Sequence, residues 1–269
     1  MKPGRLPDPM TLAFALAGGV LLAYTTLALL VIALPELGSL EHLVAVAMET
    51  EVIQSLLLTF AAGFVTVGIL FLLGTPLAYL LAREEFPLKG TVESLVDLPL
   101  VLPHTVAGLM VYLLFMARGP LGAPFAGIGI FFEDAFLGIV AAMVFVSTPY
   151  YVGAVREGFH RVPLHLEHVA RTLGATRFRA FTAVALPLAR GHLVSGGLMA
   201  WGRAVGEFAA VVMIAYFPMV ISTLIYQRFS TGGLAESRSV AFIMVAVSFC
   251  LFLLVRWVTG TSRRDRDRP

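Results

Sequence analysis

Long runs of apolar residues without charge dominate the sequence. About 20 apolar residues cross the hydrocarbon core of a bilayer as a helix, so runs of that length predict membrane spans. Six such runs occur, at about 10–34, 55–82, 98–117, 135–155, 191–217 and 239–256. They are too long and too continuous for barrel strands, which alternate apolar and polar residues. The pattern therefore predicts an all-α polytopic membrane protein with six transmembrane helices.

Composition agrees with this pattern. The 269 residues are 58% hydrophobic and 13% charged, with a mean hydropathy of +0.88. Soluble proteins carry about 25% charged residues, and disordered chains are poor in apolar residues, so both classes are excluded. We detect no internal repeat and no separate soluble segment, so residues 1–269 are predicted to form a single transmembrane domain. The first apolar run exceeds the length of a signal-peptide core, which predicts a retained anchor.

The basic residues concentrate in every second connecting segment, which is the distribution that marks the cytoplasmic side. Lys2 and Arg5 precede the first run, and Arg83 and Lys89 follow the second. Other basic residues follow the fourth and sixth runs: Arg156, Arg161, Arg171, Arg177, Arg179, Arg190, Arg256, Arg263, Arg264, Arg266 and Arg268. The opposite side has only Arg118, Arg228 and Arg238, beside a glutamate-rich segment at 36–51. Both termini and the loop at about 156–190 are therefore predicted to be cytoplasmic.

A short amphipathic helix is predicted within this loop. Leu166, Val169, Ala170 and Leu173 recur at helical spacing and form an apolar stripe. The other face is predicted to carry the polar residues Glu167, His168, Arg171 and Thr172. Pro163 suits the first turn, and Gly174 suits the position just past the end. So short a helix is unstable by itself and must dock, either on the lipid surface or in a groove of another protein.

The segment at 166–215 resembles the cytoplasmic-loop signature of permeases from binding-protein-dependent ABC importers. That signature has a Glu-Ala-Ala triplet, a Gly one helical turn later, and an aliphatic-x-Leu-Pro ending. Ala170, Gly174, Leu186 and Pro187 match it. His168 and Val169 replace the Glu and the first Ala, and Glu167 stands one residue early. The segments at 74–108 and 206–218 are similar to the molybdate/tungstate and sulfate branch of these permeases.

The resemblance implies that the loop helix is a coupling helix that docks on a cytoplasmic ATPase. Its coupling residues would be Leu166, Glu167, His168, Val169, Ala170, Leu173 and Gly174. It also implies a homodimer of this chain on two ATPase subunits, which bind ATP and Mg, and an external oxyanion-binding protein. The implied activity is import of a tetrahedral oxyanion through the cell membrane, molybdate or tungstate, with sulfate or thiosulfate as the alternative. This chain would itself bind no cofactor, metal ion or nucleic acid and would have no catalytic residue.

Five residues within the apolar runs are candidates for the translocation pathway or its gate. Charges inside a span are costly and usually functional, and Arg203 and Glu207 are four residues apart, so they share a helix face and can pair. Pro99 and Pro103 remove two backbone donors at the start of the third run, beside His104, and favour a bend there. The alternative is structural, namely an ion pair that fixes helix packing and a kink near the membrane surface.

No catalytic motif is found. The sequence has no Gly-x-x-x-x-Gly-Lys-[Ser/Thr] motif for ATP, and His160, His165 and His168 lack the ligand spacing of a metal site. The alternating charges of the C-terminal end suit solvent or lipid headgroups better than nucleic acid. Two other classes remain: a secondary transporter or channel that works without ATP, for which internal repeats would be expected, and, with less support, a membrane enzyme.

Overall fold

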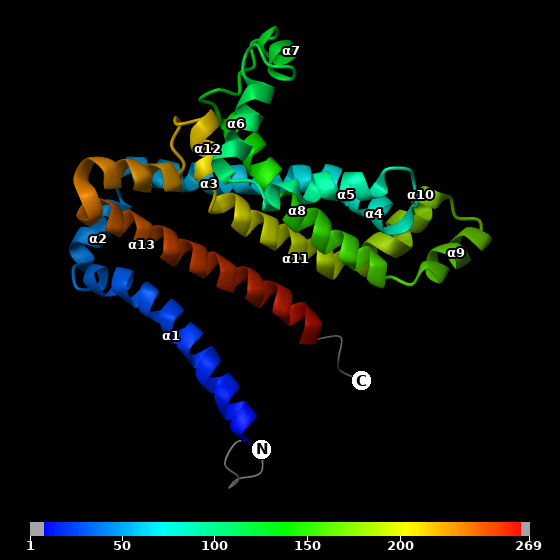
Figure 1. The fold of residues 1–269 in the computed structure, drawn as a ribbon, viewed down its shortest axis with the longest axis horizontal. Coiled ribbons are helices and arrows are strands. Elements are labelled where there is room, and N and C mark those ends of the chain that lie inside the picture. Colours follow the sequence, from blue (N-terminus) through cyan, green and yellow to red (C-terminus); the bar gives the residue numbers. More distant parts are fainter. Residues whose placement is uncertain (1–7, 265–269) are drawn as a thin grey trace. The chain divides into compact units, whose positions relative to one another are not determined.

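The computed structural model describes residues 8–264, and side chains as far as residue 253. The described residues are helical with connecting loops and contain no strand. The chain divides into two compact units, one of residues 54–224 and one of residues 1–53 with 225–269 (Figure 1). The all-α prediction is confirmed for the part of the chain that the structure describes.

The unit that contains both chain ends is held together by buried and half-buried ion pairs. It contains α1 (Pro9–Leu37), α2 (Leu40–Ala47) and most of α13 (Ile221–Arg264), which is kinked at Gly233. Arg238 Nε donates to Glu36 Oε1 at 2.6 Å, and Ser239 Oγ donates to Glu36 Oε2 at 2.7 Å. Arg228 pairs with both Glu49 and Glu51. The glutamate-rich segment therefore lies against the first half of α13.

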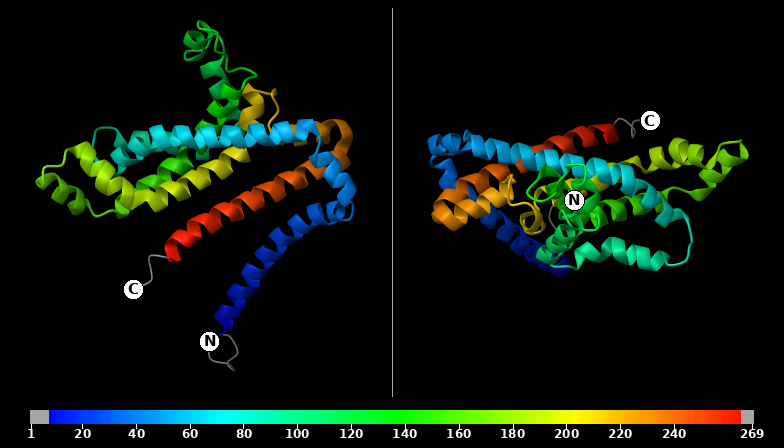
Figure 2. Two further views of the ribbon diagram at one scale, coloured as in Figure 1. Left: turned by 180° about the vertical axis from the view of Figure 1, so that it is seen from behind. Right: turned by 90° about the horizontal axis from the view of Figure 1, so that it is seen from above.

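The other unit is built around α8, which packs along α11 and against α4, α6 and α12 (Figure 2). Its elements are α3 (Thr50–Ile69), the π-helical turn η1 (Leu70–Gly74), α4 (Thr75–Arg83), α5 (Lys89–Asp97), the 3-10 turn η2 (Leu98–Leu100), α6 (His104–Phe115), α7 (Gly122–Ala126), α8 (Phe136–Arg161), α9 (Leu164–Thr172), α10 (Arg177–Ala180), the π-helical turn η3 (Phe181–Ala185), α11 (Leu186–Val205) and α12 (Ala209–Ile214). Helix α3 begins in the first unit and α13 begins in this one.

Two apolar clusters along α8 form the core of this unit. Ile139 and Met143 pack with residues of α6 and α12, including Val211. Further along, Tyr151 and Phe159 pack with residues of α4 and α11. Because mostly apolar side chains on α8 pack against all four of these helices, α8 links α4, α6, α11 and α12 in one core.

Within residues 8–264, four helical segments are long and apolar enough to cross a membrane: α1, Thr50–Arg83, α8 and Ile221–Leu253. A fifth is counted if Lys89–Leu100 and His104–Phe115 form one span bent by 114°. That bend lies at Pro99 and Pro103, where the missing backbone donors predicted it. The predicted run at 191–217 is not one helix, because α11 ends at Val205 and α12 starts at Ala209.

The predicted orientation rests partly on residues near the two ends of the chain. Lys2, Arg5, Arg266 and Arg268 lie outside the described residues, as do the side chains of Arg256, Arg263 and Arg264. The cytoplasmic position of both termini stays a prediction from the sequence.

Candidate functional site

Helix α9 forms as the spacing predicted, as a short helix on the connection between α8 and α11. Pro163 stands at its N-cap with φ −61° and ψ 122°, so the proline precedes the helix. After the helix, Gly174 has φ +91°, a left-handed conformation that favours glycine. The N–H of Ala175 donates to Ala170 O at 3.0 Å and closes the end. In Figure 1, α9 lies at the far end of its unit, beyond the ends of α4 and α8.

The inner face of α9 is anchored by Glu167, which is 4% exposed. Arg83 of α4 pairs with Glu167, with Nη2 at 2.8 Å and Nε at 2.9 Å from Oε1. Tyr79 OH donates to Oε2 at 2.5 Å, and Arg83 Nη2 also donates to the carbonyl of Val162 at 2.8 Å. Both carboxylate oxygens are therefore satisfied, as the burial of a charge requires. The polar face predicted for α9 is therefore not exposed at Glu167, because Arg83 and Tyr79 give this residue buried partners.

The outer face of α9 combines apolar and polar side chains. Val169 is 52% exposed and Leu173 84%, and His168, the residue before Val169, is also exposed. Leu166 and Ala170 are half-buried, so the predicted apolar stripe is split between the inner and outer faces. An exposed apolar pair on a short helix is typical of a surface that another protein covers.

A second cluster joins three residues at the break between α11 and α12. Arg203 and Glu207 pair as their spacing predicted, and Arg203 Nη2 lies 2.8 Å from Nδ1 of His104. Glu207 Oε1 accepts from the N–H of Ala210 at 2.7 Å, and its carbonyl accepts from Ser222 Oγ at 2.9 Å. Glu207 is 2% exposed, whereas the His104 side chain is 43% exposed. The cluster thus combines the exposed imidazole of His104 and the guanidinium of Arg203 with the buried carboxylate of Glu207.

Close packing of α6 on α12 brings His104 to this cluster. A Cβ on Gly108 would lie 2.6 Å from Ala210 O and 2.8 Å from Met213 Cβ, so only glycine allows this approach. Pro103 is the N-cap of α6, and Pro99 is buried in η2. The two prolines therefore shape the turn that directs His104 toward Arg203. Neither proline has a backbone N–H that it could donate to the cluster.

Residues 74–264 match the family described as binding-protein-dependent transport system inner membrane component. The chain belongs to this family. A relative from Thermococcus kodakarensis, named molybdate/tungstate transport system permease protein WtpB, is 40% identical over 247 residues, covering 92% of this chain and 95% of the relative. The protein of the same name from Pyrococcus furiosus is 38% identical over 256 residues, covering 95% and 98%. The sulfate transport system permease protein CysT of Synechocystis is 33% identical over 208 residues, covering 76% and 71%.

Solved structures show the same fold. The permease is similar to a chain of a bacterial ABC transporter involved in the import of alginate, with a TM-score of 0.68, 18% identity, and coverage of 95% of this chain and 98% of that one. A second structure of the bacterial alginate transporter, with its periplasmic protein bound, gives a TM-score of 0.72 at 18% identity, covering 96% and 94%. The permease is thus a multi-pass membrane component with the fold of an ABC transporter chain.

Arg83 and Tyr79 are the site residues that the sequence did not single out. Arg83 drew attention only as a basic residue that ends an uncharged run, and Tyr79 lies inside that run. Their spacing of four places both on one face of α4. That spacing is a signal, but Glu167, the partner that gives it meaning, is more than 80 residues away.

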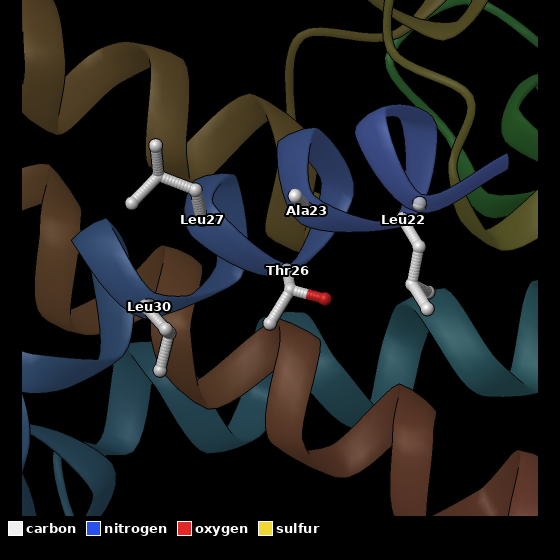
Figure 3. Close-up of a pocket in the computed structure, with 6 residues that line it drawn as sticks. Leu22, Ala23, Thr26, Leu27 and Leu30 are labelled. Atoms are coloured by element: carbon white, nitrogen blue, oxygen red, sulfur yellow. The ribbon is translucent and has the colours of Figure 1, made fainter. Parts of the chain in front are cut away.

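Other features of the permease offer less chemistry. An apolar hollow on α1 is lined by residues of that helix, with Thr26 the polar member among Leu22, Leu27 and Leu30 (Figure 3). It contains no charged side chain that could hold an anion. Among the residues described, no three His, Cys, Asp or Glu side chains come together as a metal site would need.

Proposed function

We propose that the permease is the transmembrane subunit of an ATP-driven importer of a tetrahedral oxyanion, molybdate or tungstate. The observation that carries this is an anchored helix, α9, with an exposed apolar face at the position of the family's coupling signature. Four relatives named molybdate/tungstate permease, 35–40% identical, support the substrate. Relatives named as sulfate permeases, 26–33% identical, support sulfate as the alternative, and thiosulfate stays an expectation from the resemblance.

The proposed topology has six spans, of which the third, at about 98–117, contains η2 and α6, and the fifth contains α11 and α12. Ion pairs support this topology, because they join segments that the sequence assigns to the same side of the membrane. Arg156 Nη1 lies 3.1 Å from Glu93 Oε1, which joins two segments predicted to be cytoplasmic. On the predicted outer side, Arg228 and Arg238 meet the glutamates of segment 36–51. Both termini are placed in the cytoplasm by the positive-inside rule.

In this proposal the outer face of α9 docks on the ATPase. Two copies of the permease stand on two ATPase subunits, and an external binding protein delivers the anion. ATP binding closes the ATPase dimer, draws the two α9 helices together and opens the pathway outward, and hydrolysis resets it. ATP and Mg belong to the ATPase subunits, and the permease contributes His168, Val169 and Leu173 as contacts.

His104 and Arg203 would border the pathway. Their exposed atoms would be costly in lipid, which favours a face that meets water or the second copy. Glu207 balances the charge of Arg203, so an oxyanion meets a site with no net charge and is held weakly. Weak contact suits a pathway, because a tightly bound anion would leave slowly. Pro99 and Pro103 would set the shape of this part of the wall.

Co-purification with the ATPase tests the docking. Replacing Val169 and Leu173 with glutamate places charges on the outer face of α9, and we expect the ATPase to be lost from the purified permease. Ile128→Glu is the matched control, because Ile128 is 72% exposed and follows α7, which lies far from α9 in the same unit (Figure 1). Retention of the ATPase by the Val169 and Leu173 variant, at the level of the Ile128→Glu control, would rule out α9 as the docking helix.

A further inference from the structure

The buried cluster of Glu167, Arg83 and Tyr79 joins α9 to the end of a membrane span. The Arg83 and Glu167 side chains are 8% and 5% exposed, so the pair is protected from water and salt. Arg83 also holds the carbonyl of Val162, which caps α8. One guanidinium therefore fixes three elements together: α4, α8 and α9.

Aromatic packing reinforces the same junction. The ring of Tyr79 lies edge-on to Phe159 of α8, with centroids 5.3 Å apart, and to Phe181 of η3, at 4.7 Å. Glu84, the residue after Arg83, pairs with Arg177 at the start of α10. This last pair is exposed and contributes little by itself. The buried pair joins α9 to α4 directly, and the aromatic rings join α4 to α8 and η3.

Helix α4, which contains Tyr79, follows directly on a π-helical turn, η1. The π-helical turn η3 begins at Phe181, against the same tyrosine ring. Such turns interrupt the regular hydrogen-bond ladder and occur often at functional positions. They lie between α3 and α4 and between α10 and α11.

We propose that Glu167 is a positioning residue that transmits displacement of α9 to α4, and that it does not contact the ATPase. This inference rests on the proposed function, since it assumes that an ATPase moves α9. The carboxylate is turned inward and uses both oxygens within the chain, which leaves the outer contacts to Val169, Leu173 and His168. Movement of α9 then carries the end of the second span with it.

The coupling ratio, anions transported per ATP hydrolysed in proteoliposomes, is the test. Glu167→Gln keeps the size of the side chain but removes the charge that Arg83 meets. We expect the ATPase to co-purify as before and the coupling ratio to fall about fivefold or more. Glu157→Gln is the matched control, because Glu157 forms an exposed pair with Arg161 in α8, and its coupling ratio should not change. An unchanged ratio in Glu167→Gln would overturn the inference.

Two further variants keep the test decisive if Glu167→Gln folds poorly. Exchanging the charges, with Arg83→Glu and Glu167→Arg together, should restore coupling relative to either single change, and failure to do so counts against the pair. In a Cys250→Ser background, Arg83→Cys and Glu167→Cys joined by a short bifunctional thiol reagent should still transport. Loss of transport on cross-linking would mean that the contact must open, which contradicts the inference.

Failure of the inference and failure of the proposed function give different results. If the unaltered permease binds no ATPase, the proposed function is wrong. If it transports with ATP but Glu167→Gln does so equally well, only the role of Glu167 is wrong. If Glu167→Gln loses the ATPase while Arg83→Gln keeps it, Glu167 contacts the ATPase directly and the inference is overturned.

Discussion

Two buried glutamates define the candidate sites at the scale of single residues. Glu167 fixes the inner face of α9, and Glu207 joins the end of α11 to the start of α12. A buried carboxylate is stable only when charge and hydrogen bonds compensate for lost water. Each glutamate therefore depends on an arginine, Arg83 in one site and Arg203 in the other, and removing either partner leaves the other uncompensated.

Glu207→Ala should destabilise the permease strongly. It leaves the Arg203 guanidinium, whose side chain is 18% exposed, without its counter-charge, and the Ala210 N–H without its acceptor. Loss of one partner of a buried pair costs about 3–5 kcal/mol. Thermal unfolding of the detergent-solubilised protein should show a lower midpoint, whereas Glu157→Ala, which removes an exposed pair, should leave it unchanged. Equal midpoints for the two variants would show that the Glu207 cluster is not a stabilising pair.

The sequence predicts the partner of Glu207 and does not predict the partner of Glu167. Arg203 and Glu207 are one helical turn apart, so spacing alone indicates a pair, and the structure confirms it. Glu167 and Arg83 are far apart in the chain, and periodicity cannot detect a partner on another helix. The same holds for His104, which reaches Arg203 only because α6 packs on α12.

At the scale of elements, the contact between α6 and α12 sets the geometry of the second cluster. Both helices are short, with 12 and 6 residues, and neither is long enough to cross a membrane alone. Their backbones meet at Gly108, where a side chain would collide with Ala210. The position of His104 therefore depends on a residue that has no side chain.

Gly108→Ala should destabilise this contact although alanine favours helix. Forced insertion of atoms into a packed contact costs about 1–3 kcal/mol, while the gain in helix propensity is at most about 1 kcal/mol. Gly68→Ala in α3 is the matched control, because no atom lies within 4 Å of its added Cβ and the change should be neutral or stabilising. The midpoint of thermal unfolding distinguishes them, and a Gly108→Ala protein as stable as Gly68→Ala would contradict this packing.

Apolar runs predict helices better than they predict where helices end. The runs at 10–34 and 135–155 fall within α1 and α8, and the prolines of the third run mark the observed bend. The run at 191–217 is divided near Gly206, where a break in the helix coincides with the Arg203 and Glu207 pair. Hydropathy reports the surroundings of a segment, and it does not report a break that side-chain and backbone contacts stabilise.

At the scale of the whole molecule, the basic residues concentrate in every second segment between the apolar runs. Low charge content predicts a membrane protein, and the sorting of Arg and Lys predicts its orientation. The α9 helix and its basic neighbours would face the cytoplasm, whereas the loop after α6, with Ile128, would face outward. The number of spans was the least predictable property, since it depends on how bent and broken helices are counted.

Thiol labelling of intact cells tests this orientation. In a Cys250→Ser background, Ile128→Cys should react with a membrane-impermeant maleimide from outside. His168→Cys, on the exposed face of α9, should react only after the membrane is permeabilised. Labelling of His168→Cys in intact cells, with Ile128→Cys protected, would reverse the proposed topology.

Transport by the purified permease is the most direct test of its proposed role. Proteoliposomes that contain the permease with its ATPase, supplied with ATP and the external binding protein, should accumulate molybdate or tungstate. Uptake should stop when ATP, the ATPase or the binding protein is withheld, and excess sulfate should compete weakly. Accumulation of the anion by the permease alone, driven by an ion gradient without ATP, would contradict the proposal and assign the chain to the secondary transporters.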